Sequence, residues 1–155
     1  MKIMKRTVGV VLGGLLCLLP CARLSAADEA KASEKLVIIV NEGSPLPNPC
    51  PAKKLKDVFV GTAVFENKVK LLPVNQRDPE IMGLFLKQFV GGSIGTYVSA
   101  WVKKLMSQGG SGPANAESTE GVVKIVADTK GAVGYLWRKE FTGSEKGVRE
   151  LRIAE

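Results

Sequence analysis

The first 27 residues most constrain what this chain can fold into, because their pattern predicts a segment outside the folded domain. Three basic residues precede an apolar run of 12 residues at positions 8–19. That run is too short to span a bilayer, which takes ~20 apolar residues. Small residues at 25–27 then resemble a signal-peptidase cleavage site. We therefore predict a secretory signal peptide over residues 1–27.

Two other interpretations of this N-terminus stay open. A short membrane anchor or a buried helix would also use an apolar run, although Pro20 and Arg23 end the run early. A lipidated cysteine at Cys17 or Cys21 is the other, although neither Leu16 nor Pro20 is the small residue expected before such a cysteine. We expect a periplasmic protein without a lipid anchor, and no integral membrane segment after cleavage.

Cleavage would change the charge and the cysteine content of the chain. Removing residues 1–27 deletes four basic residues and no acidic one, so the net charge falls from +7 to +3. A charge this small gives little support for a nucleic-acid partner. Cys50 is then the one remaining cysteine and has no intramolecular disulfide partner, so the fold depends on its hydrophobic core.

The chain contains no histidine, which removes the commonest general base and the commonest zinc ligand. A histidine-dependent catalytic triad is therefore excluded. No pair of carboxylates and no lysine stands in a recognisable catalytic pattern. We predict that the protein is not an enzyme and uses no metal or cofactor.

The domain organisation follows from composition and periodicity. Residues 28–35 are polar and predict a flexible leader, and residues 36–155 fit one domain in size. Apolar runs predict strands at 36–40, 68–75, 132–137 and 147–153. Spacing and capping signals predict helices at 52–60, from 78, from 93 and at 118–129. This order predicts a small α/β domain, a central sheet with helices on both faces.

The predicted helix from residue 93 has the strongest helical period in the chain. Its apolar residues share one face, and they are Ile94, Tyr97, Val98, Trp101, Val102 and Leu105. We interpret Tyr97 and Trp101, together with Phe85 of the preceding helix, as core residues. Lys103 and Lys104 are interpreted as part of a solvated face.

Four segments together resemble a known family. They are Val37–Asn41, Lys54–Gly61 (similar to L-x-D-I-F-x-G-K), Leu72–Asn75 followed by a helix to Phe85, and Gly131–Leu136 (similar to G-A-I-G-Y). In order and spacing they resemble the second lobe of phosphate-type ABC-transporter substrate-binding proteins, over about residues 36–137. The loop Gly110–Pro113 is similar to the family's GxGxP loop.

The resemblance implies a single lobe of the type II periplasmic-binding-protein (PBP) architecture, since this chain has room for one of the family's two lobes. It implies a non-catalytic solute-binding component of a transport system. Inorganic phosphate or another small anion is the implied ligand. An ABC permease or a sensor protein is the implied partner.

The family's anion turn is altered here. Its members hold the anion with an Arg at the end of a strand and a Ser-Gly-Thr turn at the start of the next helix, where free amides and the helix dipole favour an anion. Counting back from Phe85, Asn75 takes the Arg position. Pro79, Glu80 and Ile81 take the Ser-Gly-Thr positions, so no hydroxyl remains.

The candidate ligand-binding residues are Asn75, Gln76 and Arg77, with Ser44 in the proline-rich loop that follows the first strand. Arg77 lies two residues after the family's Arg position, and a gap in the alignment with the family would bring it into that position. Four interpretations that involve no ligand also stay open. In these, Asp78 and Glu80 stabilise the helix start, and residues 44–51 are a surface connection. Residues 109–113 are a mobile linker in place of an amide cradle, and Cys50 is inert.

Two functions therefore stay open. The first is a periplasmic solute-binding protein for phosphate, which the family resemblance favours. The alternative is an envelope interaction or sensing module whose PBP-like lobe no longer binds phosphate, which the altered anion turn favours.

Overall fold

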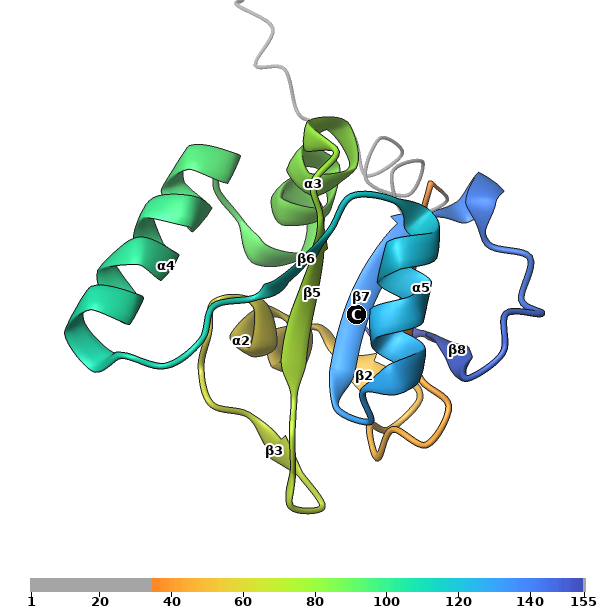
Figure 1. Cartoon of the computed structure of the whole chain (residues 1–155). Coiled ribbons are helices and arrows are strands. Elements are labelled where there is room, and N and C mark those ends of the chain that lie inside the picture. The colour runs from red at the N-terminus through yellow and green to blue at the C-terminus, as the bar shows by residue number, and fades with distance from the viewer. Residues whose placement is uncertain (1–34, 155) are drawn as a thin grey trace, which may run out of the picture.

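The structure is a computed structural model that describes residues 35–154 (Figure 1). The predicted signal peptide at 1–27, and the leader up to residue 34, lie outside the described residues. The strands are β1 (Leu36–Asn41), β2 (Cys50–Pro51), β3 (Phe65–Glu66), β4 (Val69–Lys70), β5 (Leu72–Gln76), β6 (Ala114–Ala116), β7 (Ala132–Trp137), β8 (Val148–Leu151) and β9 (Ile153–Ala154). The helices are α2 (Ala52–Phe59), α3 (Pro79–Phe85) with a π-helical turn at Leu86–Val90, α4 (Ile94–Gln108), α5 (Thr119–Asp128) and a 3-10 turn at Arg138–Glu140.

Five strands form one mixed sheet in the order β6-β5-β7-β1-β8. β5 pairs in parallel with β6 and β7, whereas β1 runs antiparallel to β7 and β8. Two small additions lie outside this sheet, the parallel pair β2-β9 and the β3-β4 hairpin. The predicted α/β class with a small central sheet is confirmed.

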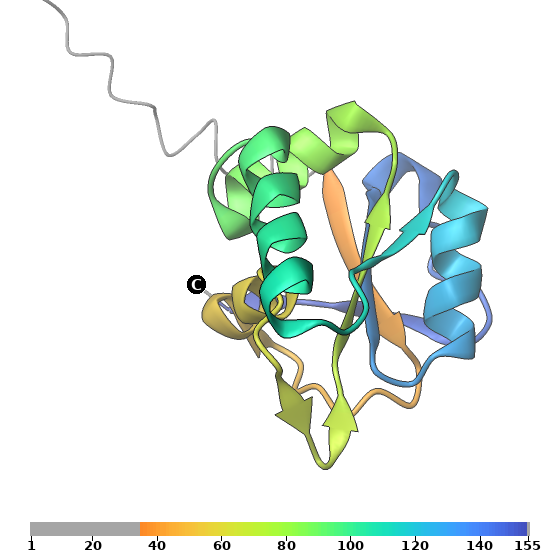
Figure 2. The ribbon, with the colours of Figure 1, turned by 60° about the vertical axis from the view of Figure 1, so that its left-hand side comes forward.

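Helices cover both faces of the sheet, as predicted, because the side chains of a strand alternate between its faces. On β1, Leu36, Ile38 and Val40 pack with the helices that precede β6, whereas Val37 and Ile39 pack with α5. Figure 2 shows α4 and α5 on opposite sides of the strands. The apolar run at 36–40 is thus a strand that is buried on both faces.

Aromatic packing fixes α2 and α3 on the first face. The rings of Phe85 and Tyr135 stack with centroids 4.0 Å apart and an interplanar angle of 5°. Phe59 lies against Phe85 with ring centroids 4.5 Å apart. All three side chains are fully buried, so the predicted core position of Phe85 is confirmed.

Glycines permit the closest approaches in this core. A Cβ at Gly134 would lie 2.7 Å from a methyl group of Val122, which brings α5 directly onto β7. A Cβ at Gly131 would lie 2.0 Å from the carbonyl oxygen of Lys70. Both glycines belong to the segment Gly131–Leu136 that carries part of the family resemblance, so its pattern has a packing reason of its own.

The strands were predicted less accurately than the helices. The expected strand at 68–75 is two strands, because β4 pairs with β3 in a hairpin whereas β5 pairs with β6 and β7 in the central sheet. The expected strand at 147–153 is divided into β8 and β9. Neither β3 nor β6 was predicted, since each has only two or three residues and no apolar alternation.

The helix α4 begins where the sequence predicts, with the Ser93 hydroxyl accepting a hydrogen bond from the Thr96 amide at 3.2 Å. Its apolar face, however, is divided between two environments. Tyr97 is buried, with 7% of its surface exposed, whereas Val98 and Val102 are 48% and 49% exposed. A helix at the side of the core contacts it along a narrow stripe, so half of a broad apolar face remains in solvent.

Candidate functional site

The candidate site lies at the carboxyl edge of the parallel strands β6, β5 and β7. In open α/β sheets ligands bind outside the carboxyl ends of the strands. Here α3 begins directly after β5, and α5 begins directly after β6. Figure 1 shows α3 and the start of α5 together at the upper end of β5. This geometry brings two helix N-termini to one edge of the sheet.

The N-terminus of α3 is capped by its own chain. The Asp78 carboxylate accepts a hydrogen bond from the Glu80 amide at 2.8 Å, and Pro79 at the first helical position has no N–H to offer. Ile81, which takes the family's Thr position, is fully buried. A carboxylate thus occupies the place at which an anion would meet the helix.

The N-terminus of α5 is capped in a similar way. The Ser118 hydroxyl accepts a hydrogen bond from the Gly121 amide at 3.2 Å. Backbone N–H donation at Glu120 and a hydrogen bond from Ser118 lower the pKa of the Glu120 carboxyl. The Thr119 hydroxyl is also engaged, because it donates to the Glu140 carboxylate.

Arg77 is the predicted site residue whose side chain reaches solvent. Its guanidinium lies 2.5 Å from the Glu117 carboxylate, and the two side chains are 63% and 74% exposed. Its backbone amide donates to the carbonyl of Ala116, which extends the pairing of β5 with β6. Exposed ion pairs contribute only about 0–1 kcal/mol, so this side chain is free to exchange partners.

Asn75 and Gln76 are buried and point to opposite faces of the sheet. The Asn75 amide donates to the Tyr97 hydroxyl at 3.2 Å on the α4 side. The Gln76 amide donates to the Thr119 hydroxyl at 3.4 Å on the α5 side. The amide oxygens of both have no hydrogen-bond partner among residues 35–154. Burial also raises the pKa of the Tyr97 hydroxyl, which therefore stays neutral.

Ser44 is at the other end of the molecule. Because β1 runs antiparallel to β7, the loop that follows β1 lies at the amino edge of β5 and β7. There the Ser44 carbonyl accepts a hydrogen bond from the Arg149 guanidinium at 3.2 Å. The structure therefore brings Asn75, Gln76 and Arg77 to one edge of the sheet and Ser44 to the opposite edge.

Three other possibilities raised by the sequence are a reactive cysteine, a metal site and a membrane-spanning helix. Burial raises the pKa of the Cys50 thiol, which makes it a poor nucleophile. Residues 35–154 contain no group of three acidic or cysteine side chains placed to hold a metal ion. Within the same range, no helix is both long and apolar enough to cross a membrane.

Three features of the edge were missed by sequence reasoning. The carboxylates of Glu117 and Glu140 were not considered, because they lie just after β6 and in the turn after β7, distant in sequence from Arg77. The cap at Ser118 had a local signal, since Ser-Thr-Glu-Gly opens a predicted helix. The contact between Asn75 and Tyr97 had none, because it joins two separate elements.

Comparison with known proteins gives structural matches only. No protein-family model and no curated protein matches this sequence. Among solved structures, it is similar to an ABC-type phosphate transport receptor from Vibrio cholerae (19% identity, TM-score 0.48, covering 78% of this chain and 47% of that one). It is also similar to a possible phosphate binding protein from Planctomyces limnophilus (13%, 0.49, 78% and 42%) and to PstS from Borrelia burgdorferi (17%, 0.48, 78% and 47%). This chain spans less than half the length of each of them.

Proposed function

We propose that this protein is a non-catalytic binding module of the cell envelope, with a PBP-like lobe that engages a protein partner and does not capture free phosphate. One observation carries the part of the proposal that concerns phosphate. The Asp78 carboxylate lies 2.8 Å from the Glu80 amide, where an anion would bind at the start of α3. An intramolecular carboxylate is always present at this position, so phosphate would have to displace it.

The charge of the whole edge supports the proposal. The segments 77–80, 117–120 and 138–140 together contain three basic and five acidic residues, a net charge of −2. The two arginines among them are engaged, Arg77 with Glu117 and Arg138 with Glu150. Phosphate, which is itself negatively charged, would meet like charge at this edge.

The family resemblance agrees with this function when the residues that carry it are divided into packing residues and residues that would touch an anion. Gly131 and Gly134 are required by close packing, and Val37–Val40 are core residues. The positions that would touch an anion are the ones that differ, namely Asn75, Pro79 and Glu80. The resemblance therefore bears on the fold more strongly than on the ligand.

Phosphate binding is the second candidate, and Arg77 is the observation that favours it. Its side chain stands in solvent between the starts of two helices, held by an ion pair worth about 0–1 kcal/mol. A charge-assisted contact to phosphate would contribute ~1.5–3 kcal/mol, enough to release Arg77 from Glu117.

Isothermal titration separates the two functions. Phosphate is titrated into residues 28–155, which contain every described helix and strand, at low and at moderate salt. We expect no saturable heat up to millimolar phosphate. Saturable binding at micromolar concentration would overturn the proposal and support a phosphate carrier.

The variant Arg77→Ala identifies the site if heat is observed. Loss of the arginine should weaken a genuine contact by about 10-fold or more, from the ~1.5–3 kcal/mol of a charge-assisted hydrogen bond. Lys130→Ala, an exposed residue after α5, is the matched control. Phosphate binding that Arg77→Ala leaves unchanged would place the anion elsewhere on the protein.

A further inference from the structure

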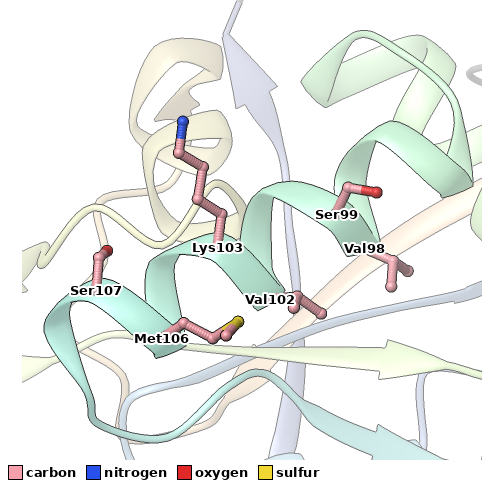
Figure 3. A pocket seen from close by; sticks show the side chains of 6 residues that line it. All are labelled: Val98, Ser99, Val102, Lys103, Met106 and Ser107. Atoms are coloured by element: carbon pink, nitrogen blue, oxygen red, sulfur yellow. The ribbon is translucent and has the colours of Figure 1, made fainter.

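The outer side of α4 carries an apolar stripe that the fold does not use. We define the α4 outer face as Val98, Val102 and Met106, which are 48%, 49% and 85% exposed. Figure 3 shows these three side chains along one side of α4, with Ser99, Lys103 and Ser107 along the other. The six residues lie on an open, nearly flat stretch of surface along this single helix.

The side of α4 that faces the domain already attaches the helix to it. Tyr97 is buried, and the Trp101 indole donates to the Phe59 carbonyl at 2.9 Å. The Lys104 ammonium donates to the Gly61 carbonyl, and Gly61 also provides the space that the Trp101 ring fills. The α4 outer face therefore has no structural task within the described fold.

Exposed apolar side chains and positive charge occur in the same part of the sequence. The exposed large hydrophobic residues all lie between positions 60 and 106 of the described chain, and they are Val60, Phe65, Leu72, Val98, Val102 and Met106. Residues 52–110 contain nine basic and four acidic residues, a net charge of +5, whereas residues 111–154 contain seven and six. Beside the α4 outer face the charged side chain is Lys103, and an apolar stripe next to a lysine that is unpaired within the described chain suits an acidic partner.

We propose that the α4 outer face binds an acidic amphipathic helix of a partner protein. This inference rests on the proposed function, because it names the surface through which the module would engage its partner. Apolar side chains of the partner helix would cover Val98, Val102 and Met106. Acidic side chains beside them would pair with Lys103, which has no ion-pair partner among residues 35–154.

The dimensions of the stripe fit such a helix. Val98 to Met106 covers nine residues of α4, and the eight steps between them span about 12 Å at 1.5 Å per residue. Anchors at positions i, i+4 and i+7 of a partner helix span nearly the same length, which is the usual arrangement when a helix docks into an apolar groove.

Charge disfavours a second copy of this chain as the occupant. A symmetric pair would bring two α4 outer faces together and place the Lys103 side chains of both copies in one interface. A lipid surface is disfavoured by size, because three apolar side chains make a small contiguous apolar area for membrane binding.

Synthetic helices test the inference directly. The probe is a fluorescein-labelled peptide with Leu at i, i+4 and i+7 and Glu at the exposed positions. A matched peptide has Lys in place of Glu, and another has Ala in place of Leu. The protein is expressed as the full chain and used in the form that accumulates, with binding followed by fluorescence anisotropy. We expect the acidic Leu peptide to bind at least 10-fold more tightly than either matched peptide.

Variants locate the binding. Val102→Glu should weaken binding of the acidic peptide at least 10-fold, and Lys103→Glu should weaken it about 3-fold, the factor expected from a partly exposed ion pair. Phe65→Glu, an equal change at an exposed apolar residue of the hairpin, should leave it unchanged, as should Lys130→Glu. Equal binding of all peptides, or no effect of Val102→Glu, would overturn the inference.

Two further measurements decide the competing occupants. Binding to phosphatidylglycerol vesicles that Val102→Glu abolishes, without peptide binding, would replace the partner helix by a membrane. A dimer in sedimentation that Val102→Glu dissociates would replace it by a second copy. A phosphate titration on the same preparation distinguishes failure of the two proposals. Saturable phosphate binding counts against the proposed function, whereas the peptide results concern the α4 outer face alone.

Discussion

The carboxyl edge of the sheet and the α4 outer face are opposites in how their chemical groups are satisfied. At the edge, amides and arginines that could hold an anion are occupied by Asp78, Glu117 and Glu150. On α4, Val98 and Met106 have no apolar cover, and Lys103 has no ion-pair partner within residues 35–154. Among the described residues, the unpartnered groups at the edge are the buried amide oxygens of Asn75 and Gln76, which accept hydrogen bonds and would repel an anion. Unsatisfied groups are the ones that gain free energy on binding, so an anion gains little at the edge, whereas an apolar partner gains by covering the outer side of α4.

The largest expected effect tests whether the core and the α4 outer face differ as described. Phe85→Ala removes a ring that is stacked on Tyr135 in the core and should lower the free energy of unfolding by about 3–5 kcal/mol. Val102→Ser changes a half-exposed side chain and should alter it by no more than about 0.5 kcal/mol. Urea denaturation followed by tryptophan fluorescence measures both.

Val126→Ser is the control for the second change, because Val126 is the same residue type in a helix but is fully buried under the sheet. We expect it to be far more costly than Val102→Ser. Similar losses for Val102 and Val126 would mean that the α4 outer face is covered in the folded protein, and the comparison would fail.

A medium effect is expected at the carboxyl edge. Asp78→Ala removes the cap of α3 and should lower the free energy of unfolding by about 1 kcal/mol. Asp78→Asn retains an acceptor for the Glu80 amide and should lower it less. Phosphate should raise the melting temperature of neither variant. A phosphate-dependent rise in Asp78→Asn would show that the carboxylate alone keeps the anion out.

The smallest effect concerns pH. The Arg138 guanidinium, 2.5 Å from Glu150, lowers the pKa of that carboxyl. A lowered native pKa contributes stability above the unfolded value of ~4.3 and loses it as pH falls through the native value. Glu150→Gln should therefore lower stability at pH 7 by about 0.5 kcal/mol, given its partial exposure. Denaturation at pH 7 and pH 3 checks this, and an equal difference at both pH values would contradict it.

Local sequence signals predicted the helices well. Asp78-Pro79 and Ser93 cap α3 and α4 as expected, because capping depends on residues within one turn of each other. The apolar run at 36–40 predicted a strand buried on both faces for the same reason, since its pattern is complete within five residues. β6 escaped prediction because three residues of a strand carry no period.

The candidate site was predicted only in outline. The sequence placed Asn75, Gln76 and Arg77 at the end of a strand, which is correct. It could not show that Asn75 would bind Tyr97 or that Arg77 would meet Glu117, because these partners are 22 and 40 residues away along the chain. The sequence also could not show that Ser44 lies at the opposite edge of the sheet from the other three residues. That placement follows from the antiparallel pairing of β1 with β7, which only the folded sheet reveals.

The sequence by itself determined the α/β class, the positions of the four α-helices within residues 35–154 and the absence of a hydroxyl from residues 79–81. These follow from spacing, capping and residue type, which act over a few residues. Tertiary structure alone decided which half of the apolar face of α4 is buried and which carboxylates surround Arg77. The physical reason is that burial and ion pairing depend on what lies across space, and α4 meets the core along a stripe narrower than its apolar face.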